Sequence, residues 1–398
     1  MIKSLTIKGY RSLKDVTIEL RPLNVMIGPN AGGKTNIMDV LALLQAGARG
    51  ELSEGIAKRG GIRSLLYAGG AEVIEMRVDI PVGGLVRVVL QLGTADSLSY
   101  EVALAPVPEG YRVKLERIEG QDIRAPMAST AGAAALAAAL GGAKRSGPEG
   151  AAQPGAGELC LSQPQTLPAG PVRERAEFIW ACLGYLTSLY RLPDTRPDAP
   201  VRQPQVVRAE TELKPDASNL GALLNLLSES DEHREKYDAI SQELQAAFPE
   251  EFVELKFPPA HGDGTIMMRW LEKAFPTRSF DTYEISDGTI NFARLATLIE
   301  TSPRWSVICI DEPEVGLHPR LIRLTAEMLQ AASRRTQFIV ATHSPTLVDR
   351  LKPEDVLVVE KVDGATQVTR RGEEELKHWL EEFSLGELWQ TGHLERAS

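Results

Sequence analysis

Lys34 and Thr35 are adjacent side chains suited to phosphate chemistry, and they end a glycine-rich stretch. The stretch reads Gly28, Pro29, Asn30, Ala31, Gly32, Gly33. This spacing is the P-loop pattern, in which glycines let successive backbone N–H groups point at phosphate oxygens. Lys34 would face the β- and γ-phosphates of ATP, and Thr35 would place its hydroxyl on Mg²⁺. Asn36 follows where we expect a helix N-terminus, which adds further N–H groups. The alternative is a glycine-rich turn with an incidental Lys-Thr pair.

Two further stretches end in groups that could act on a nucleotide. Asp311 and Glu312 follow an apolar run that begins at Trp305, and His343 follows the apolar run 338–341. Asp311 is placed to hold Mg²⁺ directly or through water, and Glu312 to polarise the attacking water as general base. His343 could contact the γ-phosphate or orient that water. The alternatives are an acidic pair that starts a loop and a structural histidine.

The elements that must position these residues form an α/β fold. Residues 23–27, 305–310, 338–341 and 356–360 are continuous apolar runs that alternate with helical patterns at 36–48, 289–298 and after Pro319. Such runs are typical of a parallel sheet covered on both faces, and ligands bind beyond the carboxyl ends of its strands. We therefore expect a P-loop NTPase with a mainly parallel core sheet.

The remaining segments predict an antiparallel meander and an inserted helical subdomain. Residues 2–8 and 15–20 form two strands, and period-two alternation continues from 71 to 119 in four sets, of which Val86 to Leu92 is the second. Helical patterns cover 174–191, a helix capped by Ser218, 231–248 and 373–388, and short strands are expected at 252–257 and 264–270.

The predicted organisation has four parts. Residues 1–125 hold the P-loop and the antiparallel sheet, 126–173 form a low-complexity Ala/Gly/Pro-rich linker, 174–250 a helical subdomain, and 251–398 the C-terminal part of the ATPase head. For the linker we favour a tolerated insertion over a mobile lid.

Composition limits the class of protein. The chain has 398 residues with a formal net charge of −10, so any DNA contact must come from a local basic patch, for which Arg334-Arg335 and Arg370-Arg371 are candidates. Three scattered cysteines predict no disulfide framework. We expect no signal peptide and no membrane span, and hence a cytoplasmic protein.

The order of these motifs resembles the ABC-class ATPase head. Between the P-loop and Asp311 lies Ser286-Asp287-Gly288, which resembles the class signature, and Asp311 leads into Pro313-Glu314-Val315-Gly316-Leu317-His318-Pro319. In that class the signature heads a helix and binds the γ-phosphate of ATP held by the P-loop of a second subunit. The resemblance therefore implies an ATP-dependent homodimer, with Ser286 and Gly288 at the nucleotide.

Within this class the chain is most similar to stand-alone RecF-like and OLD-like ATPases. Residues 36–285 separate P-loop and signature, which is longer than in transporters, and Ile7 to Leu13 resembles the N-terminal strand-turn of RecF-like proteins. The resemblance implies that Arg11 approaches the nucleotide. The Mg²⁺-bridging glutamine is not placed, with Gln121 and Gln205 as weak candidates. Because no Asp-x-Asp follows Glu360, we expect no Toprim nuclease domain.

The expected function is ATP hydrolysis coupled to DNA repair or to defence against foreign DNA, with a separate nuclease or toxin as partner. The alternative is a switch that binds ATP, hydrolyses it slowly or not at all, and controls such a partner.

Overall fold

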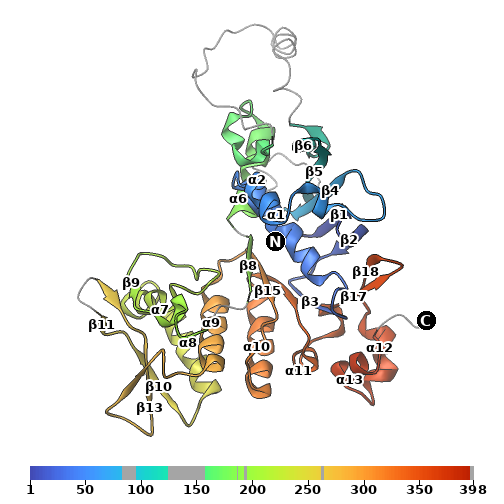
Figure 1. Ribbon diagram of the computed structural model, residues 1–398. Coiled ribbons are helices and arrows are strands. Elements are labelled where there is room, and N and C mark those ends of the chain that lie inside the picture. Colours follow the sequence, from blue (N-terminus) through green and yellow to red (C-terminus); the bar gives the residue numbers. More distant parts are fainter. Residues whose placement is uncertain (83–95, 124–156, 186, 192–194, 261–263, 395–398) are drawn as a thin grey trace. The chain divides into compact units, whose positions relative to one another are not determined.

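A computed structural model of the chain describes residues 1–82, 96–123, 157–185, 187–191, 195–260 and 264–394. It divides the chain into two compact units, which we describe separately (Figure 1). The first unit comprises residues 1–21, 29–187 and 359–368, and the second comprises residues 22–28, 188–358 and 369–398.

The first unit contains the expected antiparallel sheet. Its strand order is β2-β1-β4-β5-β6-β7. The strands are β1 (Ser4–Tyr10), β2 (Leu13–Glu19), β4 (Ile74–Pro81), β5 (Ser97–Val107), β6 (Gly110–Ile118) and β7 (Gln121–Asp122). One face of this sheet carries alternate residues of its strands, and those such as Leu5, Met76 and Tyr100 are apolar and buried. This alternation is the period-two pattern from which the strands were predicted. The expected strand around Val86 to Leu92 lies outside the described residues.

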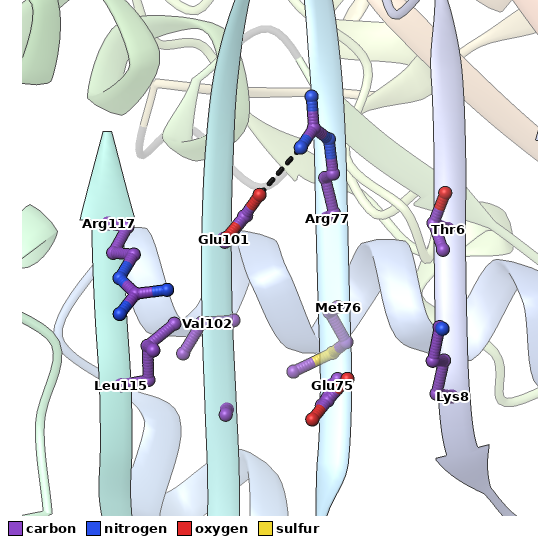
Figure 2. Close-up of a pocket in the computed structure, with 10 residues that line it drawn as sticks. Thr6, Lys8, Glu75, Met76, Arg77, Glu101, Val102, Leu115 and Arg117 are labelled. Atoms are coloured by element: carbon purple, nitrogen blue, oxygen red, sulfur yellow. Dashed lines mark hydrogen bonds and ion pairs between the residues drawn. The ribbon is translucent and has the colours of Figure 1, made fainter. Parts of the chain in front are cut away.

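The other face of this sheet is polar and partly hollow (Figure 2). Thr6, Arg77, Glu101 and Arg117 lie side by side on β1, β4, β5 and β6. Arg77 donates to Glu101 at 2.6 Å, which is a cross-strand pair of opposite charges. The hollow has a volume of about 350 Å³ and is also lined by Lys8 and Leu115.

Helices of the first unit complete its core. They are α1 (Lys34–Ala48), α2 (Leu52–Lys58), α3 (Ile62–Leu65) and α6 (Pro171–Gly184), with short 3-10 turns η2 (Cys160–Ser162) and η3 (Pro164–Thr166). Residues 157–173, the end of the predicted linker, are thus structured here. The buried Glu116 carboxylate accepts hydrogen bonds from the backbone N–H groups of Cys160 (2.8 Å) and Leu161 (2.9 Å). Residues 126–156 of that segment lie outside the described residues.

The second unit contains the parallel sheet. Its strands β17 (Val356–Val362), β3 (Leu23–Ile27), β16 (Gln337–Ala341) and β15 (Val307–Asp311) lie in that order and run parallel, with β8 (Thr187–Tyr190) next to β15. β3 and β16 are buried along their whole length, as the apolar runs predicted.

Helices and short sheets surround this core within the second unit. The helices are α7 (Leu220–Glu229), α8 (Arg234–Ala247), α9 (Asp287–Thr301), α10 (Pro319–Ala332), α11 (Pro345–Val348), α12 (Glu373–Leu380) and α13 (Leu385–Gln390), with η4 (Pro200–Arg202) and η5 (Pro353–Asp355). Two three-stranded sheets have the orders β10-β13-β14 and β11-β12-β9. Their strands are β9 (Gln205–Val206), β10 (Phe252–Lys256), β11 (Pro259–Ala260), β12 (Thr265–Ile266), β13 (Arg269–Glu272) and β14 (Ser279–Asp281). Helix α9 packs on α8 and α10 (Figure 1).

Three local predictions are corrected by the structure. The helix expected over 174–191 ends at Gly184, and Thr187–Tyr190 is a strand. A short apolar run is compatible with both a helix and a strand, so the sequence pattern did not distinguish them. Asn219 rather than Ser218 precedes α7; its side chain bonds the loop before it, accepting from Lys214 N–H at 2.9 Å. The helix expected over 373–388 is broken into α12 and α13, because Ser384 forms a capping box with Glu387.

The helices expected as one subdomain, residues 174–250, are divided between the units. Helix α6 belongs to the first unit, where it packs on α1, whereas α7 and α8 belong to the second. No helix among the described residues is both long and apolar enough to cross a membrane.

Candidate functional site

The chain leaves β3 at Gly28 in the second unit and forms the rest of the P-loop in the first unit. Pro29, Asn30, Ala31 and Thr35 are exposed there, whereas Lys34 is only 6% exposed. The Lys34 ammonium donates to the Pro29 carbonyl at 3.1 Å, which holds the charge over the loop. No side chain caps α1, since its N-cap is Gly33 with φ 119°. The loop therefore presents a cation and a helix N-terminus, the features that bind phosphate.

Arg11 lies in the turn between β1 and β2, in the same unit as the rest of the P-loop. Its backbone is left-handed, with φ 46°. Its guanidinium lies 2.9 Å from an Asp39 carboxylate oxygen and 3.4 Å from the Asn36 side-chain oxygen. Arg11 and Asn36, two residues predicted to bind the nucleotide, are therefore in contact, and Arg11 also binds Asp39 one turn further along α1.

Asp39 organises the cations beside the P-loop, although the sequence analysis did not single it out. It accepts from the Tyr10 hydroxyl and from Arg59, both at 2.7 Å. Burial alone would raise the pKa of Asp39, but these hydrogen bonds and the charges of Arg59 and Arg11 hold it below its ordinary value. The signal available for it was a single carboxylate in a helix that is apolar on most sides.

In the second unit the acidic pair and the histidine lie at one sheet edge. The strand register aligns Asp311 with Ala341 and Ala341 with Met26. The backbone N–H of Glu312 donates to the Ala341 carbonyl at 2.8 Å, and that of Thr342 to Met26 at 3.1 Å. Asp311, Glu312 and His343 therefore leave the sheet at the carboxyl edge from which Gly28 also leaves, as the sequence predicted.

Glu312 and His343 face one another. Glu312 Oε1 and His343 Nε2 are 3.9 Å apart, and the two side chains are 43% and 36% exposed, respectively. Glu312 has φ 50°, a conformation that non-glycine residues seldom adopt and that often accompanies functional sites. A small polar group between these two side chains could contact both.

Glu314 connects the acidic loop to His343. Its Oε1 accepts a 2.6 Å hydrogen bond from the His343 backbone N–H. Its Oε2 is buried and has no hydrogen-bond partner among the described residues. Burial raises the pKa of Glu314, and the neighbouring Glu312 carboxylate acts in the same direction. This contact fixes the backbone of a candidate catalytic residue.

The signature residues begin α9 in the second unit. Ser286 is its exposed N-cap, and its hydroxyl accepts from the Thr289 N–H at 3.1 Å. Gly288 packs on the acidic loop so closely that a Cβ there would lie 2.6 Å from the Gly316 carbonyl oxygen. Signature and acidic loop are thus in contact within one chain.

Arg202 is a second residue that the sequence analysis missed. It is 5% exposed and donates to the carbonyls of Thr282 and Ile285 and to the Asp287 carboxylate. It therefore holds the turn that leads into Ser286 and balances the charge of Asp287. Its partners lie about eighty positions away in the chain, so local patterns gave no signal.

Neither candidate for the bridging glutamine stands out. Gln205 is buried, and its side chain accepts from Ala222 N–H (3.0 Å) and donates to the Val201 carbonyl (3.4 Å), which is a structural role. Gln121 is exposed on the short strand β7 of the first unit.

The donors near these loops suit Mg²⁺. Thr35 in the first unit and Asp311 in the second each offer an oxygen ligand of the kind that this ion prefers, and Mg²⁺ usually takes only one or two protein ligands together with phosphate oxygens and water. The described residues contain no group of three or more His, Cys, Asp or Glu side chains that could hold a metal by themselves.

Two family models match the segments of the chain that contain these motifs. Residues 1–60 match the family model described as "AAA ATPase domain", and residues 180–349 match "AAA domain, putative AbiEii toxin, Type IV TA system". Both models describe AAA-family ATPase domains, and each covers less than half of the chain. The first match covers the P-loop and Arg11, and the second covers the signature, the acidic pair and His343.

Solved structures show the same fold. An SMC head bound to the C-winged helix domain of ScpA is 16% identical and superposes with a TM-score of 0.55, covering 95% of this chain and 99% of that chain. A second structure is an SMC head with an extended coiled coil, bound to the C-terminal domain of ScpA from Pyrococcus furiosus. It is 14% identical and superposes with a TM-score of 0.54, covering 96% of this chain and 98% of that chain. The predicted fold class, an ABC-type P-loop ATPase head, is therefore confirmed.

The predicted relationship to OLD-type ATPases also has support. The chain is 41% identical to an OLD nuclease of Thermus scotoductus over 44 residues, which is 11% of this chain and 8% of that protein. Together with the family matches, this confirms the resemblance to RecF/OLD-like ABC-class ATPases.

Proposed function

We propose that the chain binds ATP with Mg²⁺ and hydrolyses it at a site shared by two copies. The observation that carries this proposal is the strand register at Asp311, Ala341 and Met26, which puts the acidic pair, His343 and the entry to the P-loop at one sheet edge. Residues 28–36 and Arg11 hold the nucleotide. Thr35 and Asp311 hold Mg²⁺, which neutralises phosphate charge when bound.

Glu312 is the proposed general base. Its exposed carboxylate accepts a proton from the water that attacks the γ-phosphorus, and the leaving ADP takes the bond electrons. His343 contacts the γ-phosphate or orients that water, and Glu314 keeps its backbone in place. The 3.9 Å separation of Glu312 and His343 supports a shared task.

The two-copy arrangement rests on the signature. Ser286 and the N-terminus of α9 are exposed, so they are available to a second molecule. A hydroxyl at a helix N-terminus suits the γ-phosphate of ATP held by another chain. ATP would then join two heads, and hydrolysis would release them.

Lys34→Ala is expected to abolish tight ATP binding while the fold is kept. Losing one partner of a buried charge pair costs about 2–5 kcal/mol, so the Kd for ATP should rise at least about thirtyfold. Isothermal titration calorimetry measures it, with Lys58→Ala as control because Lys58 is an exposed lysine of the first unit. Wild-type affinity in folded Lys34→Ala would contradict the P-loop assignment.

We propose that ATP hydrolysis by this protein serves DNA repair, or defence against foreign DNA, together with a partner effector. The two arginine pairs give it limited support, because Arg335 donates to the Ile299 carbonyl (2.7 Å), Arg370 to Asn24 (2.9 Å) and Arg371 to the Leu394 carbonyl (3.1 Å). Three of the four guanidinium groups thus make contacts within the chain. Arg334 is exposed and is the better candidate.

DNA binding, if it is the output, should weaken steeply with salt, with a slope of log K against log salt of about −0.9 per phosphate contact. Fluorescence anisotropy with labelled duplex between about 50 and 200 mM salt measures this slope. Arg334→Ala should make this slope shallower by about one phosphate contact. The control is Arg304→Ala, because Arg304 is also an exposed arginine. No binding in any nucleotide state would contradict the DNA-linked role.

The second candidate function is a partner-controlling switch. It is favoured by the family description "putative AbiEii toxin, Type IV TA system" for residues 180–349. In this role ATP binding without rapid turnover would hold or release a toxin or nuclease. Steady-state turnover with and without DNA separates the two functions, since only the first requires sustained hydrolysis.

A further inference from the structure

A hairpin whose residues 359–368 belong to the first unit lies there against the P-loop. It is formed by β17 and β18 (Ala365–Thr369), which are joined by Asp363 and Gly364. Both turn residues have positive φ, 50° and 82°, which is the Asp-Gly signal of a tight hairpin. The P-loop residues that meet this hairpin are Gly32 and Gly33.

Thr366 makes the central contact. Its side chain is 3% exposed, and its hydroxyl donates to the Gly32 carbonyl at 2.8 Å. The same Oγ1 lies 2.7 Å from the Ser12 Oγ, and the Thr366 backbone N–H donates to the Ser12 carbonyl at 2.7 Å. One buried residue therefore bonds both the P-loop and the turn that carries Arg11.

The two glycines are required by this contact. A Cβ on Gly33 would lie 2.2 Å from the Thr366 Oγ1, and a Cβ on Gly32 would lie 2.6 Å from the Val359 carbonyl oxygen. Gly33 also has φ 119°, which side-chain-bearing residues rarely adopt. The hairpin backbone and Thr366 thus pack directly on the loop with no space for a side chain.

The direction of the Gly32 carbonyl has a consequence for the loop. In a trans peptide the C=O and the following N–H point in opposite directions. Because Thr366 binds the Gly32 carbonyl on the hairpin side, the Gly33 N–H points away from the hairpin. We propose that Thr366 is a positioning residue for nucleotide binding, which orients the Gly32–Gly33 peptide so that its N–H donates to a phosphate oxygen.

The same network extends to Arg11. Asn36 donates to the Ser12 hydroxyl at 2.8 Å, and its oxygen lies 3.4 Å from Arg11. Ser12 is 9% exposed, and its hydrogen bond with Thr366 is buried, whereas the bonds of Asn36 are partly buried. Thr366 therefore also supports the residue at the helix start and, through it, the position of Arg11.

This inference rests on the proposed ATP binding, and the test is equilibrium binding of ATP with Mg²⁺. Thr366→Val keeps the shape but removes the hydroxyl, so the Kd should rise about three- to tenfold, the net value of one hydrogen bond. Thr366→Ser keeps the hydroxyl and should remain within about twofold. Thr369→Val is the matched control, the same change on the same strand at a half-buried threonine.

Ser12→Ala provides an independent variant should Thr366→Val fold poorly, as thermal melting would show. It should also weaken ATP binding, and the double variant should lose less than the product of the two effects, because both remove one network. Wild-type Kd in folded Thr366→Val, or an equal loss in Thr369→Val, overturns the inference. Absence of ATP binding by the wild-type chain would instead overturn the proposed function, and the inference with it.

Discussion

Glu312→Gln is expected to lower ATP hydrolysis by about 10²–10⁴-fold, the usual contribution of a positioned acid or base. Glutamine keeps the size of the side chain and its hydrogen-bonding oxygen but cannot take a proton from water. It should also tolerate the local backbone, with φ 50°, about as well as glutamate does. ATP should remain bound, and the dimer should accumulate because its release is blocked.

Phosphate-release kinetics and light scattering with Mg-ATP measure the two parts of this expectation. Glu314→Gln is the matched control on the same loop, because an amide oxygen can still accept the 2.6 Å hydrogen bond from His343. We expect it to stay within a few-fold of wild type, the range of a single hydrogen bond. If Glu312→Gln hydrolyses ATP normally and remains monomeric, Asp311-Glu312 is an ordinary acidic loop.

Local signals predicted the parts of the site that short segments build by themselves. The run Leu23–Ile27, the glycines and the helix from Lys34 form a contiguous unit whose pattern specifies strand, loop and helix. Ser286 could be read as an N-cap for the same reason, since a cap depends on residues within one turn. Parallel order then followed, because apolar strands alternate with helices.

Contacts between distant positions could not be predicted in this way. Thr366 meets Ser12 from 354 positions away, and Arg202 meets Asp287 from 85 positions away. Neither threonine nor arginine carries a local mark that it will be buried beside a functional loop. The first pair depends on where the hairpin lies against the turn after β1, and the second on where the segment around Arg202 meets the start of α9. Both placements are set only in the folded chain.

Two local errors had signals that were present but not used. Ser384 and Glu387 have the spacing of a capping box, which marks a helix start inside the segment 373–388. Asp39 is the one carboxylate of α1, a helix that is apolar on most sides, and buried carboxylates are rarely without cationic partners. Such a carboxylate predicts cationic partners nearby, and these are Arg11 and Arg59.

Ser286→Arg is expected to stop hydrolysis by a different route from Glu312→Gln. Arginine would place bulk and positive charge at the exposed start of α9, where the proposed second subunit brings its ATP. The protein should bind ATP but remain monomeric. Losing the N-cap costs about 1 kcal/mol by itself, so Ser286→Ala, which loses the cap without adding bulk, is the control for stability. It should retain more activity than Ser286→Arg.

Mixing Ser286→Arg with Lys34→Ala tests whether the site is built from two chains. The first variant keeps an intact P-loop and the second an intact signature, so a mixed dimer contains one complete composite site. Some hydrolysis should return, at a fraction of the wild-type rate, although each variant alone is inactive. Turnover is measured as the ratio of the two variants is varied, and it should peak at equal amounts, where mixed dimers are most abundant. If mixing restores nothing while each variant is folded, the P-loop and signature of separate chains do not form a common site. The signature would then be read as the N-cap of α9 alone, with Arg202 as its structural support.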